Sequence, residues 1–132
     1  MPPVVFINCD RQPFIDQILA IEKTLETRTR NTLKSVCGQY VFLAETHRGK
    51  KPIVRAATFL GDAHKITTKA QWDSLREYTC IREGSEYDWK HDTKVKHVYS
   101  LAGTHPVEPF TPPEGRRHGR VWMDYEEGGA TA

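Results

Sequence analysis

The chain has 132 residues, of which 38% are hydrophobic and 27% are charged, and its formal net charge is +2. This length and composition are typical of one globular domain and exclude an intrinsically disordered chain. A net charge this small does not by itself imply a nucleic-acid partner, so a basic surface has to arise from local clustering of lysine and arginine.

Three widely spaced cysteines without a CxxC pair predict reduced thiols, and they argue against a disulfide framework or a structural zinc site. The N-terminal segment lacks the basic start and apolar core of a signal peptide, and no apolar run approaches the roughly 20 residues that span a membrane. These features predict a soluble, cytoplasmic protein with no membrane partner. We expect a single domain over residues 1–125 and a flexible C-terminal tail over residues 126–132.

The first elements in chain order are a short strand and an amphipathic helix. Residues 4–7 are β-branched or aromatic and predict a buried strand. Pro13 suits the first turn of a helix, and apolar residues then recur at helical spacing as far as Ile21. Residues 23–28 follow with β-compatible threonines between charged side chains.

The middle of the chain predicts a hairpin and a second helix. Residues 38–45 and 53–60 are both strand-like, and the polar turn between them predicts an antiparallel pair. Thr67 or Thr68 offers a capping oxygen for a helix that carries Trp72 on one side.

The last third predicts loops around one strand. Residues 80–93 are polar and favour a loop, whereas residues 95–101 alternate as a strand does. Four prolines in residues 106–115 predict a wrapping loop, and residues 120–123 predict a closing strand. Together these elements predict an α+β fold, a small and partly closed antiparallel β-barrel with two or three flanking helices.

The densest polar segment directly follows the first helix and reads Lys23-Thr24-Leu25-Glu26-Thr27-Arg28. In an extended backbone Thr24, Glu26 and Arg28 share one face, and Lys23 lies on the other. Burying so many charged side chains beside a helix end is unfavourable for a folded core. The segment therefore indicates a binding site.

The order of a helix, Lys-Thr-x-Glu-x-Arg and then Gly-x-Tyr-Val-Phe-Leu-Ala at the head of a hairpin resembles the ASCH domain, a family of the PUA-like superfamily of small β-barrels. The resemblance covers Phe6 to about Leu101. It implies a basic cleft that is lined by the residues of the motif and binds RNA or a modified nucleoside. The sequence departs from the family at Ile21, where a glycine usually stands two residues before the motif lysine.

One branch of this family resembles small amidohydrolases that remove acetyl groups from acetylated cytidine with a lysine, a threonine and a glutamate. Lys23 matches the lysine, but Glu26 stands where the branch has its threonine. The glutamate of the branch has three candidates here, Glu77, Glu83 and Glu86. Another branch is reported as nucleases.

The first hypothesis is a binding module whose partner is RNA or a modified nucleoside. Cationic side chains attract phosphate, Glu26 accepts hydrogen bonds from a base amino group, and an aromatic ring stacks on the base. The expected ligand-binding residues are Lys23, Thr24, Glu26, Arg28, Arg30, Tyr87 and Trp89. The alternative for these residues is structural: Glu26 and Arg28 pair across a sheet, and the aromatic rings cover the barrel mouth.

The second hypothesis is a hydrolase acting on a nucleoside or nucleic acid, with Lys23 and Glu26 as its catalytic residues. A lysine buried near Arg28 has its charged form disfavoured and becomes a base or nucleophile, with Glu26 as a general base. If Glu26 instead neutralises Lys23, the site only binds. The sequence leaves the choice between binding and catalysis open.

No cofactor or metal site is predicted, because the six histidines are scattered and none belongs to a His-Glu-x-x-His pattern. Residues 116–120 hold three arginines around a glycine, which suits contact with a phosphate backbone. Alternatively, Arg120 stacks with Trp122 in a barrel wall while the other two arginines are solvated.

Overall fold

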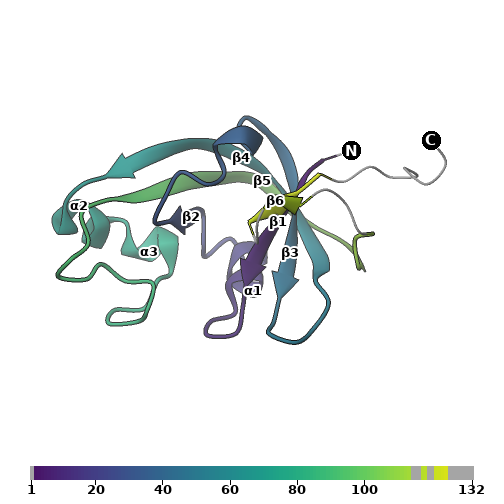
Figure 1. The fold of residues 1–132 in the computed structure, drawn as a ribbon, viewed down its shortest axis with the longest axis horizontal. Helices are drawn as coiled ribbons and strands as arrows, with labels where there is room; N and C mark the ends of the chain where they lie inside the picture. The colour runs from purple at the N-terminus through teal and green to yellow at the C-terminus, as the bar shows by residue number, and fades with distance from the viewer. Residues whose placement is uncertain (1, 114–116, 119–120, 125–132) are drawn as a thin grey trace.

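The structure is a computed structural model, and it describes residues 2–113, 117–118 and 121–124. Over these residues the chain forms one seven-stranded sheet with three short α-helices and one 3₁₀ turn (Figure 1). In chain order the elements are β1 (Val4–Asn8), α1 (Phe14–Leu19), β2 (Leu25–Arg28), η1 (Lys34–Val36), β3 (Gln39–Thr46), β4 (Ile53–Ile66), α2 (Lys69–Ser74), α3 (Arg76–Thr79), β5 (Lys96–Phe110), β6 (Arg117–His118) and β7 (Trp122–Met123).

The sheet is mixed, with the strand order β2-β5-β4-β3-β1-β7-β6. The predicted α+β class is confirmed, but the expectation of a purely antiparallel sheet is wrong, because β1 pairs with β3 in parallel. The chain between these two strands includes α1, β2 and η1, and parallel neighbours need a long crossover of this kind. The strand pairings among the described residues run from β2 to β6 without joining these two edges, so they do not close a barrel.

The long strands β4 and β5 bend the sheet, and they arch over the helices in Figure 1. Their pairing contains three register shifts, and such bulges increase bending and twist. Gly61 lies within the third of them, between Leu60 and Ala63, where a Cβ atom would collide with the Ser100 side chain. The bend brings β2, at one sheet edge, close to β1. The Arg28 guanidinium of β2 donates to the Phe6 carbonyl of β1 over 3.0 Å.

The predicted wrapping loop over residues 106–115 is wrong for its first half, because β5 continues to Phe110. Pro106 pairs with Ala56 of β4. Strand β2 pairs with β5 only as far as Ser100, so the prolines lie beyond the part of β5 that needs donors on both sides. A proline is tolerated on such an edge because its missing N–H breaks no ladder hydrogen bond.

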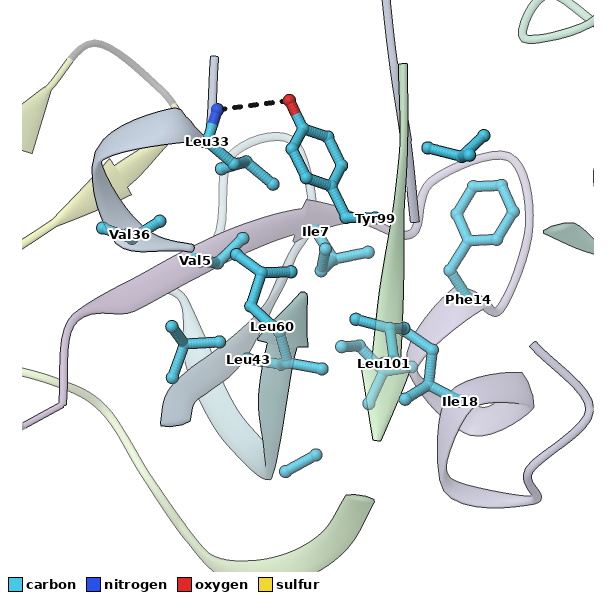
Figure 2. Packing of buried hydrophobic residues seen from close by; sticks show 14 of the residues in the cluster. Val5, Ile7, Phe14, Ile18, Leu33, Val36, Leu43, Leu60, Tyr99 and Leu101 are labelled. Atoms are coloured by element: carbon cyan, nitrogen blue, oxygen red, sulfur yellow. Dashed lines mark hydrogen bonds between the residues drawn. The ribbon is translucent and has the colours of Figure 1, made fainter. Parts of the chain in front are cut away.

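The main core lies between the sheet and the helices (Figure 2). Phe14, Ile15 and Ile18 of α1 are buried against residues of β1, β3, β4 and β5. Tyr99 of β5 is fully buried, and its phenol donates to Asn31 over 2.8 Å. The core therefore fixes the segment after β2 as well as the helix before it.

Several local predictions are confirmed. Strands β3 and β4 form the expected antiparallel hairpin, and Thr68 caps α2 by accepting from the Gln71 N–H over 3.1 Å. Helix α1 is shorter than predicted and ends at Leu19. The three cysteines are free thiols. None of the helices in the described part of the chain is long and apolar enough to cross a membrane.

The predicted closing strand appears as β7, which pairs with β1. Arg116 and Arg120 of the basic cluster and the predicted tail over residues 126–132 lie outside the described residues. The arrangement of that cluster remains a prediction.

Candidate functional site

Helix α1 ends in a tight turn that leads directly into the Lys23–Arg28 segment. The Ile21 N–H donates to Ile18 over 3.0 Å, and the Glu22 N–H donates to Gln17 over 2.9 Å. These two bonds form a Schellman motif, whose C′ residue is left-handed and usually glycine. Ile21 occupies that position with a φ of 58°. The isoleucine therefore adopts this turn conformation at a steric cost.

The turn directs the Lys23 side chain into the protein. Its ammonium donates to the Thr79 carbonyl over 2.7 Å and lies 3.6 Å from the Glu26 Oε1 atom. It also lies 4.8 Å from the centroid of the Phe14 ring, a cation–π contact. Burial lowers the pKa of Lys23, and the neighbouring Glu26 carboxylate opposes that shift. Because Lys23 precedes β2, strand alternation does not separate it from Glu26.

Glu26 is the centre of the charged cluster, with Lys23 and Arg28 on either side. Its Oε2 atom lies 3.1 Å from the Arg28 guanidinium, and its Oε1 atom accepts from the Thr27 N–H over 3.0 Å. Burial alone would raise the pKa of Glu26, but Arg28 and Lys23 outweigh it and lower the pKa below its ordinary value. The carboxylate is therefore ionised at neutral pH.

A cavity of about 450 Å³ opens beside this cluster. Its walls come from β1, the start of α1, β2, the end of β3, the loop over residues 80–93 and the start of β5. The lining residues are Phe6, Ile7, Asn8, Phe14, Glu26, Thr27, Arg28, Thr29, Thr46, Ile81, Tyr87 and Lys96. Of the residues proposed from the sequence, three line this cavity: Glu26, Arg28 and Tyr87.

The other four proposed residues are not among its lining. Lys23 lies behind Glu26, with a side chain that is 0% exposed. Thr24 joins the sheet through its backbone, since its carbonyl accepts from the Leu101 N–H of β5 over 2.9 Å, while its own N–H donates to Tyr78 of α3 over 2.9 Å. Arg30 is exposed beyond the end of β2.

The fourth, Trp89, belongs to the core of the protein. It is partly buried, and its ring lies 6.4 Å from the Trp72 ring. Trp89 does not line this cavity, and its role in base stacking remains a prediction.

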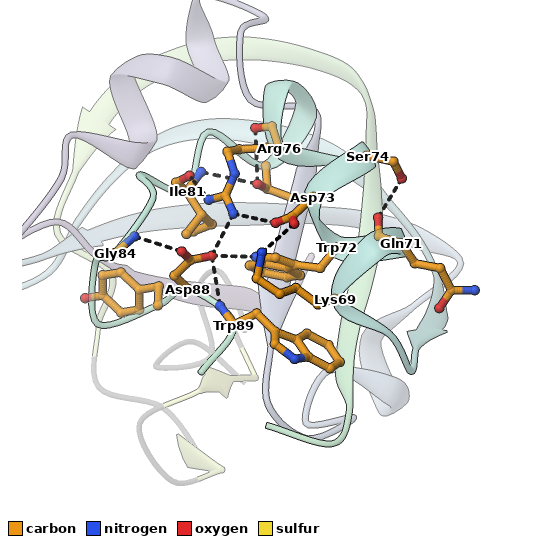
Figure 3. Close-up of polar contacts among 12 residues, drawn as sticks. Lys69, Gln71, Trp72, Asp73, Ser74, Arg76, Ile81, Gly84, Asp88 and Trp89 are labelled. Atoms are coloured by element: carbon orange, nitrogen blue, oxygen red, sulfur yellow. Dashed lines mark hydrogen bonds and ion pairs between the residues drawn. The ribbon is translucent and has the colours of Figure 1, made fainter. Parts of the chain in front are cut away.

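The Asp88 carboxylate accepts four hydrogen bonds that help to hold the loop over residues 80–93 in place (Figure 3). Asp88 accepts from the Trp72 indole over 2.7 Å, from the Arg76 guanidinium over 2.9 Å and from two backbone N–H groups of its own loop, those of Gly84 and Trp89. Burial alone would raise the pKa of Asp88, but these donors hold it well below its usual range. The polar loop is thereby attached to α2 and α3 close to the cavity.

This anchoring fixes the position of Tyr87, the residue before Asp88. The Tyr87 ring packs edge-on against Phe14, with 5.5 Å between the ring centroids. The sequence pointed to Tyr87 as a conspicuous aromatic in a polar loop, and the structure places it on the cavity wall.

Among the described lining residues, Lys96 is the charged residue that was not predicted from the sequence. Its side chain is buried, its ammonium donates to the Tyr87 carbonyl over 2.7 Å, and it lies 4.9 Å from the Trp72 ring centroid. Burial lowers the pKa of Lys96. No carboxylate of the described residues lies within ion-pair distance of it. The sequence carried a signal, since Lys96 shares a strand face with the apolar Val98.

No second carboxylate joins Glu26 among the described residues that line this cavity. Of the three glutamates considered for a catalytic role, Glu86 lies 3.4 Å from Arg11 in an exposed pair, and neither Glu77 nor Glu83 lines the cavity. Within the described residues, no group of three or more His, Cys, Asp or Glu side chains is arranged to hold a metal ion.

Three solved structures share this arrangement of strands and helices. They are the crystal structures of ASCH from Zymomonas mobilis and of two of its single-residue mutants, one with tyrosine replaced by phenylalanine and one with serine replaced by alanine. Each has a TM-score of 0.62 and 19% sequence identity to this chain, and the match covers 82% of this chain and 73–75% of theirs. The chain has the ASCH-domain fold. The resemblance drawn from residues 23–28 is thus confirmed at the level of the fold.

No family model matches the sequence, and no curated protein does either. At 19% identity the solved ASCH structures support the fold and leave the ligand to be argued from this chain's own residues.

Proposed function

We propose that the cavity binds a nucleotide unit of RNA, with a modified nucleoside as its smallest ligand. The observation that carries this proposal is the charge of the lining. Arg28 and Lys96 contribute two cations, and Glu26 is the only carboxylate among the described lining residues. A cavity with one surplus positive charge, buried aromatic walls and an ionised carboxylate suits a ligand that combines a planar base with an anionic group.

Each lining group has a distinct role in this proposal. Glu26 accepts from the amino group of a base, while Arg28 holds the carboxylate in place. Tyr87 stacks on the base, since its ring is fixed by Phe14 and by the anchored loop. Lys96 contacts the phosphate, because its ammonium has three donors and the structure pairs it with a single carbonyl.

The proposal extends beyond the cavity in two respects. Arg30, exposed after β2, is an outer phosphate contact for a longer RNA. Lys23 lies on the side of Glu26 away from the cavity, and its positive charge keeps the carboxylate ionised. We also propose a cytoplasmic location, which three free thiols support.

The alternative is hydrolysis of the same ligand with Lys23 and Glu26 as the catalytic pair. Glu26 is an ionised carboxylate on the cavity wall, as a general base must be. Lys23 is less suitable, because its ammonium points to Thr79 and its side chain has no exposed surface. Binding is therefore the function that the geometry supports best.

The test is calorimetric titration of the protein with the four nucleoside 5′-monophosphates and with short single-stranded RNA. Lys96→Met keeps the apolar stem over Trp72 and removes the charge, so we expect it to weaken binding of the best nucleotide at least tenfold. Lys65→Met, on the exposed part of β4, is the matched control and should leave the affinity unchanged. Absence of binding by every nucleotide and RNA overturns the proposal, as does an equal effect of the two variants.

Incubation with N4-acetylcytidine and with RNA distinguishes binding from hydrolysis. Turnover that disappears in Glu26→Gln while ligand affinity is retained establishes the alternative. Stable binding without turnover supports the binding module.

A further inference from the structure

Tyr87 lines a second cavity as well as the first, and we propose that this second cavity holds the neighbouring nucleotide of an RNA chain. This inference rests on the proposed function of the first cavity. The second cavity has a volume of about 360 Å³. Its lining residues are Arg11, Gln12, Arg82, Ser85, Glu86 and Tyr87.

The two cavities adjoin, because the same two chain segments form walls of both. In the segment before and into α1, Asn8 and Phe14 line the first cavity, while Arg11 and Gln12 between them line the second. In the other segment, the consecutive residues 81 and 82 line one cavity each. In the proposal, a ligand extends from the first cavity past Tyr87 into the second.

The second cavity carries cationic groups that are free to bind an anion. Arg82 is exposed and forms no ion pair with any described residue. Arg11 lies 3.4 Å from Glu86, but the two side chains are 75% and 56% exposed. A solvated pair of this kind contributes well under ~1 kcal/mol, so Arg11 can turn to a phosphate at little cost. With Glu86 included, the lining keeps one surplus positive charge.

The wall between the two segments is already assembled. The buried Gln12 amide donates to the Cys80 carbonyl over 2.6 Å and to the Gln17 side chain over 3.0 Å, which ties the two segments together. Asp88 fixes the remainder of the loop. Ser85 lines the same cavity, and its hydroxyl is buried without a hydrogen-bond partner in the described part of the chain. Binding therefore costs little free energy for ordering the residues of this wall.

The chemistry of this pair of cavities specifies the ligand class. Two arginines beside an aromatic ring suit a phosphodiester group and a stacked base. A lone nucleoside fills only the first cavity, whereas a dinucleotide places its linking phosphate between Tyr87 and Arg82. The favoured ligand is thus single-stranded RNA of at least two nucleotides.

The experiment compares each nucleoside 5′-monophosphate with the corresponding 5′-phosphorylated homodinucleotide by calorimetric titration. We expect the best dinucleotide to bind at least tenfold more tightly, equivalent to ~1.4 kcal/mol. Arg82→Gln should abolish this gain and leave the mononucleotide affinity unchanged. The matched control is Arg48→Gln, which removes the same charge from an exposed residue that lines neither cavity.

The outcomes separate the two proposals. A mononucleotide that binds, together with a dinucleotide that gains nothing, overturns the second subsite and leaves the first intact. An equal loss in Arg82→Gln and Arg48→Gln attributes the gain to general charge and also overturns the subsite. If no nucleotide binds at all, the proposed function itself fails and the subsite fails with it.

Discussion

Lys23 and Lys96 are two buried lysines near the same cavity, and their surroundings differ in one decisive respect. Both donate to a backbone carbonyl over 2.7 Å, and their ammonium groups lie 4.8 Å and 4.9 Å from an aromatic ring centroid. Lys23 has a carboxylate partner, Glu26, whereas Lys96 has none among the described residues. Only Lys96 of the two lines the cavity.

This difference teaches that burial of a charge does not identify a functional residue. A lysine that is paired, hydrogen-bonded and fully enclosed has its interactions completed by the protein. Lys96 feels the Asp88 carboxylate, which opposes the fall in its pKa, but it makes no ion pair among the described residues. A lysine that makes no ion pair and borders a cavity leaves an interaction for a ligand to complete. Substitutions at the two lysines and at their neighbours test this distinction.

The largest effect is expected from Lys23→Met, which leaves the Glu26 carboxylate with one cation fewer and the Thr79 carbonyl without its donor. Breaking a buried pair by removing one partner typically costs about 3 kcal/mol or more, so we expect a loss of that size in the free energy of unfolding. Urea unfolding monitored by tryptophan fluorescence measures it. A stable Lys23→Met protein that has lost only ligand binding would contradict the structural role given to Lys23.

The pH dependence of stability tests Glu26, the other half of that pair. Because the pKa of Glu26 in the folded protein lies below its ordinary value of 4.5, the unfolded chain takes up the proton first as the pH falls. The stability from this carboxylate is therefore complete above pH 4.5 and is lost as the pH falls through the lower folded pKa.

Glu26→Gln should flatten this part of the acid limb and lower stability at neutral pH by about 2 kcal/mol, since Lys23 then lacks its counter-charge. Urea unfolding from acidic to neutral pH measures both effects. Glu108→Gln is the control, because Glu108 is exposed and makes no ion pair among the described residues, and it should leave the slope nearly unchanged. Parallel acid limbs for the wild type and Glu26→Gln would rule out Glu26 as the source.

Lys96→Met should have a smaller effect on stability than Lys23→Met. It removes one hydrogen bond to Tyr87 but also a desolvated charge that makes no ion pair among the described residues, and we expect a change within about 1 kcal/mol. The same urea titration gives the value, and the ligand titration gives the binding loss. A destabilisation equal to that of Lys23→Met would remove the distinction between the two lysines.

The sequence predicted those parts of the fold that local patterns control. The first strand, the β3–β4 hairpin and the Thr68 cap each depend on residues close together in the chain, and all three are present. The far half of β5 was missed because prolines usually exclude a strand, and only the sheet order shows that this half lies on an edge.

The candidate site was predicted in part for the same reason. Glu26 and Arg28 are two positions apart in one strand, so the sequence predicts that they share a face. Lys96 and Arg82 reach their cavities through the pairing of β5 and through the loop held by Asp88, contacts that join residues far apart in the chain. No local pattern encodes that convergence.

The smallest predicted effect concerns the turn that places Lys23 inside the protein. Ile21 is 58% exposed, so its side chain gains little from burial, and its left-handed backbone is unfavourable for a β-branched residue. Ile21→Gly relieves that strain but adds freedom to the unfolded chain, so we expect a net gain in stability of about 0.5 kcal/mol in the urea titration. Ile21→Val keeps the β-branch and should gain nothing. A loss of stability in Ile21→Gly would mean that the isoleucine side chain itself supports the turn, and that the position of Lys23 depends on it.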